Sequence, residues 1–266
     1  MTLEASFDQQ AKHFDQRAGI NTQDCQKIID VLNKFYQKTS QKNWLEIGAG
    51  TGQIGALALN KTNHYVGIDI SEEMLNEFRK KANHIELYQA DGNASWPLAD
   101  KSVSMSFSSR TVHLLSADHV LNELQRVHFE GYFLIGRIRR ESSENIKDTM
   151  KEKMRDILQS LGYQSRKGEE NRKRLLDLLC ERGAERIKPI VATSWNEEYS
   201  PQRSIESWMS KDGLAGQEVN SSIKEECMKK LSDWATDRYG SINYQENVQQ
   251  TYIIEGINLN TFCSQV

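Results

Sequence analysis

Three glycines at alternate positions are the residues of this chain whose types and spacing point most directly to chemistry. Gly48, Gly50 and Gly52 follow a short apolar run and lead into a second apolar run at residues 53–59. A strand that ends in such a turn and opens a helix can hold a nucleotide-like ligand against bare backbone. Glu46 lies two positions before the first glycine. A carboxylate placed there, at the end of the strand, can meet a cationic or hydroxyl-bearing ligand.

The spacing of these glycines discriminates between ligand classes. A dinucleotide fingerprint that starts at Gly48 requires its third glycine at position 53, and this chain has Gln53 there. The third glycine comes one residue early, at Gly52. A nicotinamide oxidoreductase is further disfavoured because no Tyr-x-x-x-Lys pair follows the fourth expected strand. For the glycines alone, a tight turn without any ligand remains the alternative interpretation.

Two more acids occur where later strands are expected to end. Residues 64–69 read as a buried strand that ends in Asp69, and residues 85–90 read as a strand followed by Asp91. Asp69 follows the first glycine by about 20 residues, as a ribose-binding acid does. In an open parallel sheet, ligands bind outside the carboxyl ends of the strands. We therefore expect Glu46, Asp69 and Asp91 to converge on one site, although Asp91 alone would also suit an ordinary turn.

The stretch Trp-Leu-Glu-Ile-Gly-Ala-Gly-Thr-Gly at residues 44–52 resembles motif I of the class I S-adenosylmethionine-dependent methyltransferases. The later segments follow in the order of that family, and the His-Leu pair after the fourth strand is similar to its small-molecule branch, the ubiquinone and biotin-pathway type. The resemblance implies S-adenosyl-L-methionine as the cofactor and S-adenosyl-L-homocysteine as the product. It implies a cofactor site made of Arg17, Glu46, Gly48, Ala49, Gly50, Gly52, Asp69, Ile70, Met74, Asp91, Gly92, Asn93 and Ser108.

Candidate catalytic residues follow the fourth and fifth expected strands. His113 is the candidate base, because its ordinary pKa suits proton transfer near neutral pH, with a structural histidine as the alternative. Arg110 and Arg137 lie where an acceptor would approach. Arginine binds carboxylates bidentately, so a carboxylate-bearing acceptor is one hypothesis and surface ion pairs are the other. Methyl transfer from a sulfonium depends mainly on positioning, so a weak catalytic signal is expected.

The alternation of strand and helix patterns predicts an α/β fold with a doubly wound, seven-stranded, mostly parallel sheet of the Rossmann-like methyltransferase type. Beyond 64–69 and 85–90, strands are expected at residues 103–109, 131–138, 186–195 and 249–257. Ser71 is the expected N-cap of the helix after the second strand, residues 110–115 resemble the start of a further helix, and the apolar spacing over 143–161 predicts another.

We expect a single domain over residues 1–266, without linkers or repeats. Residues 1–40 are expected to place a helical segment over the cofactor. There Arg17 pairs with the cofactor carboxylate, or, as the alternative, stays solvated. Residues 141–168 and 198–245 interrupt the alternation with extra helices, and we expect these insertions to act as lids, with a simple extension of the fold or a dimer face as the alternative.

Composition restricts the class of protein further. The chain has 266 residues, a net charge of -3 and 38% hydrophobic residues, so it can bury a core and shows no electrostatic footprint for nucleic acid or an anionic membrane. No apolar stretch approaches the length of a membrane span, and the acidic start does not resemble a signal peptide. We expect a cytoplasmic monomer or homodimer. The four cysteines are scattered, which indicates neither a zinc site nor a disulfide framework.

These observations favour a metal-independent methyltransferase for a small molecule, with oxygen as the acceptor atom. Acids that would hold magnesium are not found after the fourth strand, where the chain reads Phe-Ser-Ser-Arg at residues 107–110. The Asn-Pro-Pro-Tyr signature of enzymes that methylate amino groups in nucleic acids is also missing there. Transfer to nitrogen or carbon of a small metabolite or peptide, and a non-catalytic S-adenosylmethionine-binding protein, remain the alternatives.

Overall fold

The computed structural model describes residues 8, 11, 14–15, 19–58, 64–82, 85–140, 144–163, 168–211, 213–215 and 217–264, with the backbone alone at 168–169. By its internal contacts the chain divides into two compact units. The first unit comprises Met1–Arg137, Gly168–Thr193 and Tyr252–Val266, and the second comprises Ile138–Lys167 and Ser194–Thr251. The residues expected to form lids fall almost entirely in the second unit, and their role as lids stays a prediction.

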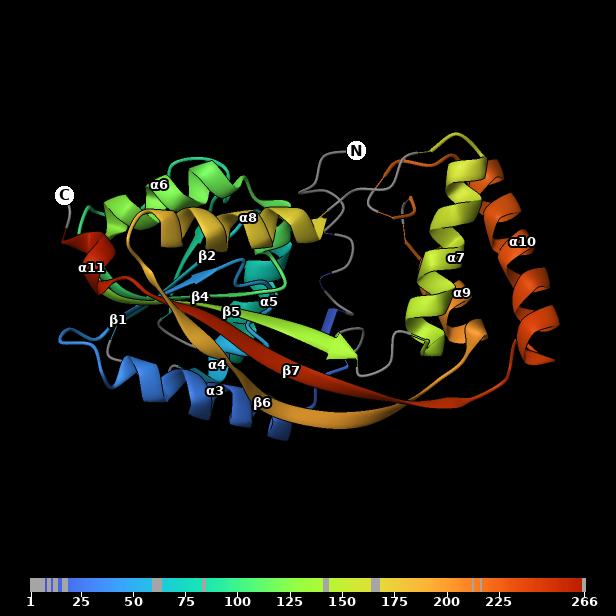
Figure 1. Ribbon diagram of the computed structural model, residues 1–266, viewed down its shortest axis with the longest axis horizontal. Helices are drawn as coiled ribbons and strands as arrows, with labels where there is room; N and C mark the ends of the chain where they lie inside the picture. The colour runs from blue at the N-terminus through green and yellow to red at the C-terminus, as the bar shows by residue number, and fades with distance from the viewer. Residues whose placement is uncertain are drawn as a thin grey trace. The chain divides into compact units, whose positions relative to one another are not determined.

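Seven strands form one sheet in the order β3-β2-β1-β4-β5-β7-β6 (Figure 1). The strands are β1 (Asn43–Ile47), β2 (His64–Asp69), β3 (Glu86–Gln89), β4 (Val103–Ser109), β5 (His128–Arg140), β6 (Glu185–Tyr199) and β7 (Glu246–Asn258). The pairs from β3 through β5 are parallel, and β7 runs antiparallel. The predicted mostly parallel, doubly wound sheet is confirmed. The patterns at 64–69 and 103–109 match the observed strands to the residue, whereas β5, β6 and β7 are longer than predicted.

The central strand β4 is buried along almost its whole length, although its sequence alternates apolar and polar residues. Its serines are buried because their hydroxyl groups find partners inside the sheet. Ser108 donates to the carbonyl oxygen of Ile47 at 2.9 Å, and Ser104 donates to that of Gln41 at 2.7 Å. A hydroxyl group that makes a hydrogen bond inside the protein costs little free energy to bury. Alternation in β4 therefore does not mark one face exposed to solvent.

Helices cover both faces of the sheet in the first unit. Figure 1 shows α6 (Ala117–Val127) and α8 (Gly168–Glu181) above the strands and α3 (Thr22–Tyr36) below them. The short helices are α4 (Gly55–Ala58), the 3₁₀ helix η3 (Val112–Leu114) and α11 (Asn260–Cys263), and α5 (Glu72–Lys81) follows β2. Ser71 accepts from the backbone N–H of Met74 at 3.2 Å, which confirms the predicted N-cap of α5.

An aromatic row joins α3 to α5 across the face that these helices cover. The rings of Tyr36, Trp44, Tyr65 and Phe78 follow one another with centroid separations of 5.6, 6.3 and 6.0 Å. All four side chains are buried. Large aromatic side chains contribute much of the apolar area that stabilises a core. This row packs α3 and α5 against β1 and β2.

The second unit has its own core, formed by α7 (Ile146–Ser160), α9 (Pro201–Met209) and α10 (Ser221–Tyr239). Met150, Met154, Cys227 and Leu231 are buried in it. The apolar spacing that predicted a helix over 143–161 thus corresponds to α7. Among the helices that the structure describes, none combines the length and the apolar character of a membrane-spanning segment.

Candidate active site

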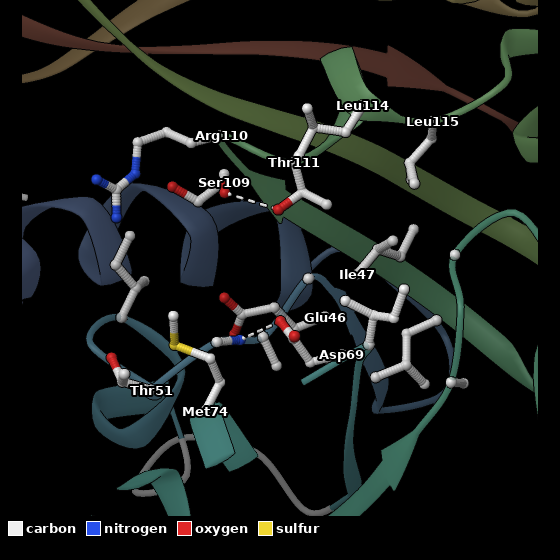
Figure 2. A pocket seen from close by; sticks show the side chains of 18 of the residues that line it. Glu46, Ile47, Thr51, Asp69, Met74, Ser109, Arg110, Thr111, Leu114 and Leu115 are labelled. Carbon is white, nitrogen blue, oxygen red and sulfur yellow. Dashed lines mark hydrogen bonds between the residues drawn. The ribbon is translucent and has the colours of Figure 1, made fainter. Parts of the chain in front are cut away.

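A pocket opens in the first unit beside the carboxyl ends of β1, β2 and β4. Its empty space, counted together with the open solvent at its mouth, is about 900 Å³. Figure 2 shows its lining from close by. The structure brings together many residues that the sequence predicted, namely Glu46, Gly48, Ala49, Gly50, Asp69, Ile70, Met74, Asp91, Gly92 and Arg110. The expected convergence of three acids from three strand ends is therefore present.

The glycine loop needs its glycines for different reasons. The φ angles of Gly48, Gly50 and Gly52 are +71°, +55° and +71°, in the left-handed region that favours glycine. A methyl group at Gly48 would lie 2.1 Å from the hydroxyl oxygen of Thr111, so the loop and the segment after β4 require close contact there. A methyl group at Gly50 would meet no atom within 4 Å. Gly50 thus presents bare backbone to the open space of the pocket.

Asp69 is held in place by backbone N–H groups. One carboxylate oxygen accepts from the N–H of Gly50 at 2.8 Å, and the other accepts from the N–H of Ser71 at 3.0 Å. Burial raises the pKa of Asp69, while these backbone hydrogen bonds act in the opposite direction. Each carboxylate oxygen has further acceptor capacity. The group is therefore oriented in advance to accept hydrogen bonds from a ligand.

Glu46 is the most deeply buried acid of the pocket, with 3% of its surface exposed. Its carboxyl group accepts a 2.5 Å hydrogen bond from the hydroxyl of Tyr65. Burial, with the nearby charge of Asp69, raises the pKa of Glu46 to about 8, although the Tyr65 hydrogen bond lowers it. At neutral pH the protonated form is thus favoured, unless a cation enters the site.

The side chain of Leu115 makes one end of the pocket apolar, and Asp91 and Gly92 lie beside it. A methyl group at Gly92 would lie 2.9 Å from the side chain of Leu115, which also lines the pocket. The carboxylate of Asp91 accepts from the N–H of Asn93 at 2.9 Å and stays exposed. A flat apolar ring with a hydrogen-bonding edge would suit this end.

Residues 45–131 match a protein family described as a methyltransferase domain. This segment is a methyltransferase domain, which makes the chain an S-adenosylmethionine-dependent methyltransferase. Its matched segment contains every described residue of the pocket lining except Phe14. The cofactor of this methyltransferase is S-adenosylmethionine.

Solved structures share the fold of this methyltransferase at low sequence identity. A protein from Bacillus halodurans, provisionally named a methyltransferase, is 14% identical, with a TM-score of 0.54 over 87% of this chain and 98% of that one. The YcgJ protein from Bacillus subtilis is 16% identical, with a TM-score of 0.52 over 86% of this chain and 97% of that one. Identities this low show the fold alone. No curated protein matches this methyltransferase in sequence.

The pocket of the methyltransferase fits its cofactor in chemical terms. S-adenosylmethionine carries a sulfonium, an ammonium group, a ribose diol and an adenine ring, and the pocket offers two buried acids for the cationic groups. Asp69 has acceptor capacity for the diol, and Gly50 leaves room for a ligand at van der Waals distance. The apolar walls include Ile47, Leu114 and Leu115. The assignment of individual residues to parts of the cofactor remains a proposal.

Three residues predicted to bind the cofactor do not line this pocket. Gly52 faces α5, because a methyl group there would lie 2.2 Å from the ring of Phe78. Ser108 is buried within β4 and bonded to Ile47. Asn93 is exposed, and its side-chain oxygen accepts from the N–H of Ser116 at 2.7 Å. All three are next to the site in sequence, but their side-chain positions point to roles in packing or in the loop.

The predicted catalytic residues have different surroundings. Arg110 lines the pocket, whereas His113 and Arg137 do not. His113 lies half-buried on η3. Arg137 is paired with Glu255 on β7, with a nitrogen-to-oxygen distance of 3.1 Å. Arg17, predicted to meet the cofactor carboxylate, lies outside the described residues.

Several lining residues were not predicted from the sequence. Thr51 lies between two of the glycines, and Thr111 and Leu114 follow Arg110 directly, so proximity to the motifs was a usable signal for them. Phe14 is different, because it precedes the glycine loop by a whole helix and a strand. Only the fold brings its ring to the pocket.

Proposed function

We propose that this methyltransferase transfers a methyl group to an oxygen atom of a small-molecule acceptor, without a metal ion. The observation that supports it is the pocket in which the bare backbone of Gly50, the carboxylate of Asp69 and the buried Glu46 face the same space. The end of β4 with the residue after it, Ser108 to Arg110, carries neither the amino-methylating signature nor a magnesium-binding acid. Within the described parts of the chain, no three potential His, Cys, Asp or Glu ligands cluster around a metal position.

When bound, S-adenosylmethionine would supply an activated methyl group. Its methyl–sulfur bond would break as the acceptor oxygen bonds to the methyl carbon, and the sulfonium would become a neutral thioether. The protein has to align the acceptor with that methyl group and to exclude water. Such positioning can contribute on the order of 7–11 kcal/mol to lowering the barrier. The apolar wall of Leu114 and Leu115 and the glycine loop would hold the cofactor for this alignment.

Removal of a proton is needed only when the acceptor oxygen carries one. The described pocket lining contains no histidine or lysine, and His113, the predicted base, does not belong to that lining. We therefore propose an acceptor whose oxygen is already ionised, such as a carboxylate. We do not assign Arg137 to binding the carboxylate of such an acceptor, because Arg137 is paired with Glu255.

The test uses S-adenosylmethionine with a deuterated methyl group and a panel of small carboxylic acids, phenols, alcohols and amines. Mass spectrometry follows the labelled product and S-adenosylhomocysteine together. Labelled ester or ether at a rate that EDTA leaves unchanged is the expected result. Labelled amine or carbon product alone, or loss of turnover on adding EDTA that magnesium restores, would contradict the proposal.

His113→Asn tests the absence of a protein base. A kcat within a few-fold of the wild-type value over the whole pH range is expected, because alignment is retained. A loss of roughly 100-fold or more, together with the disappearance of a titration near pH 6.5, would instead make His113 the base.

A further inference from the structure

Arg110 has a backbone conformation that arginine rarely adopts. It follows the last residue of β4, and its N–H donates to the carbonyl oxygen of Gly136 on β5 at 3.2 Å. Its φ angle is +60°, in the left-handed region where residues other than glycine are strained. Such strain occurs preferentially at ligand sites, where the surrounding structure enforces it. Here the conformation places a long cationic side chain in the pocket wall.

One donor of the Arg110 guanidinium has no hydrogen-bond partner in the part of the chain that the structure describes. Its Nε atom is buried and makes no hydrogen bond with any described residue. The group lies 5.2 Å from the ring centroid of Phe14. Burial lowers the pKa of Arg110, whereas its electrostatic interactions with Tyr252 and Asp15 act in the opposite direction. A buried cation that keeps an unpaired donor is costly unless a ligand supplies the acceptor.

The position of Arg110 along the pocket indicates which part of a ligand it meets. Figure 2 shows its guanidinium on the side of Thr51, with Leu114 and Leu115 on the other side and Asp69 between them. Gly92 packs against Leu115, so the end near Asp91 is opposite the end of Arg110. In an adenosyl amino acid, the adenine and the carboxylate are at opposite ends with the ribose between them. The order of the pocket residues fits that order of groups.

We infer that Arg110 binds the carboxylate of the amino-acid end of S-adenosylmethionine through charge-assisted hydrogen bonds. It is the one Lys, Arg or His residue in the described lining, whereas Glu46 and Asp69 would repel a carboxylate. Arginine is suited to this role because its fork of donors matches a carboxylate. The inference rests on the proposed placement of the cofactor, and it moves Arg110 from the acceptor side of the reaction to the cofactor side.

The test measures binding by calorimetry to the full chain with three ligands that differ at one end. S-adenosylmethionine has the carboxylate, decarboxylated S-adenosylmethionine lacks only that group, and 5′-methylthioadenosine lacks the whole amino-acid end. Arg110→Met removes the charge and keeps a long side chain, and Arg110→Lys keeps the charge. Arg186→Met is the matched control, because Arg186 is an exposed arginine of the same unit, paired with Asp177.

We expect Arg110→Met to weaken binding of S-adenosylmethionine by about 10- to 100-fold and to leave both truncated ligands within a few-fold. Arg110→Lys should recover part of the loss, and Arg186→Met should bind all three ligands as the wild type does. Unchanged binding of S-adenosylmethionine by Arg110→Met would overturn the inference, as would an equal loss for all three ligands. If the wild type binds none of them, the placement of the cofactor is wrong, a result distinguishable from both.

Discussion

The backbone N–H of Gly50 donates a 2.8 Å hydrogen bond to the carboxylate of Asp69, and this contact ties the loop after β1 to the end of β2. Gly50 lies in the loop after β1, and Asp69 is the last residue of β2. The hydrogen bond orients the carboxylate, and the missing side chain of Gly50 keeps the space beside it open. Gly50 thus contributes to the cofactor site in two ways. Its N–H group orients Asp69, and its lack of a side chain leaves room for the ligand.

Gly50→Val is predicted to abolish cofactor binding while the fold is retained. A Cβ atom at position 50 would meet no protein atom within 4 Å, so the new side chain would extend into pocket space that the cofactor needs. We expect the Kd for S-adenosylhomocysteine to rise by about 100-fold or more, which corresponds to about 3 kcal/mol. Calorimetry measures binding, and circular dichroism verifies the fold.

Gly162→Val is the control for this substitution. Gly162 also has a positive φ angle, +88°, and open space around it, but it belongs to the second unit. Its valine variant carries comparable backbone strain and should bind the cofactor as the wild type does. Unchanged affinity of Gly50→Val would refute the site assignment.

Gly52→Ala is predicted to destabilise the protein more than it weakens binding directly. The added methyl group would lie 2.2 Å from the buried ring of Phe78, so α5 or the loop has to move. Overpacking of this kind costs about 1–3 kcal/mol of unfolding free energy. Urea unfolding measures the loss. Combining it with Phe78→Leu should cost less than the sum of the two single changes, because the two sites are in contact; strict additivity would argue against the contact.

The stability of the free protein is predicted to fall as the pH rises between about 4.5 and 8. Burial raises the pKa of Glu46 from 4.5 to about 8, so in this window the folded protein holds a proton that the unfolded chain has lost. The contribution is complete below the unfolded pKa and is lost as the pH passes the folded one, with a slope of at most about 1.4 kcal/mol per pH unit.

Glu46→Gln isolates this contribution, because the amide does not titrate. Urea unfolding at several pH values between 5 and 8 should show a shallower slope for the variant. The pKa of Asp69 is also raised, so part of the slope should persist. Identical slopes for the variant and the wild type would mean that Glu46 is ionised in the free protein.

Binding of S-adenosylmethionine near neutral pH is predicted to release a proton from the pocket. The cationic sulfonium favours the carboxylate form of Glu46, which is protonated in the free protein because of its burial beside Asp69. Calorimetry in phosphate and in Tris, which differ in ionisation enthalpy, should give different binding enthalpies. The difference should be smaller for S-adenosylhomocysteine, which lacks the sulfonium, and smaller still for Glu46→Gln. Equal enthalpies in both buffers for the wild type would exclude proton release.

Local sequence patterns were sufficient for the strands, the glycine loop and the acids that end the strands. His64 to Asp69 and Val103 to Ser109 form strands with the predicted bounds, and Ser71 caps the helix that follows. These features depend on residues close together in the chain. Apolar period, turn chemistry and capping are properties of a few neighbouring residues, so they can be read from the sequence.

Other features depend on residues far apart, and the sequence did not reveal them. The segment after β4 was predicted to start a helix at Arg110, but Arg110 adopts a positive φ angle, and a 3₁₀ turn follows it. The sequence left Arg137 either an acceptor's carboxylate or an ion pair, and the structure pairs it with Glu255, 118 residues later. The division of the chain into two compact units is likewise a property of long-range contacts.

The sequence by itself determined that a strand, a glycine turn and three strand-end acids would make one ligand pocket, because parallel strands bring their carboxyl ends to one edge whatever the details of packing. Only the tertiary structure decided which side chains enter that pocket. Gly52 turns to Phe78, Arg137 to Glu255, and Phe14 and Arg110 to the ligand space. The reason is physical: the direction of a side chain and its partners depend on close packing with residues that are distant in the chain.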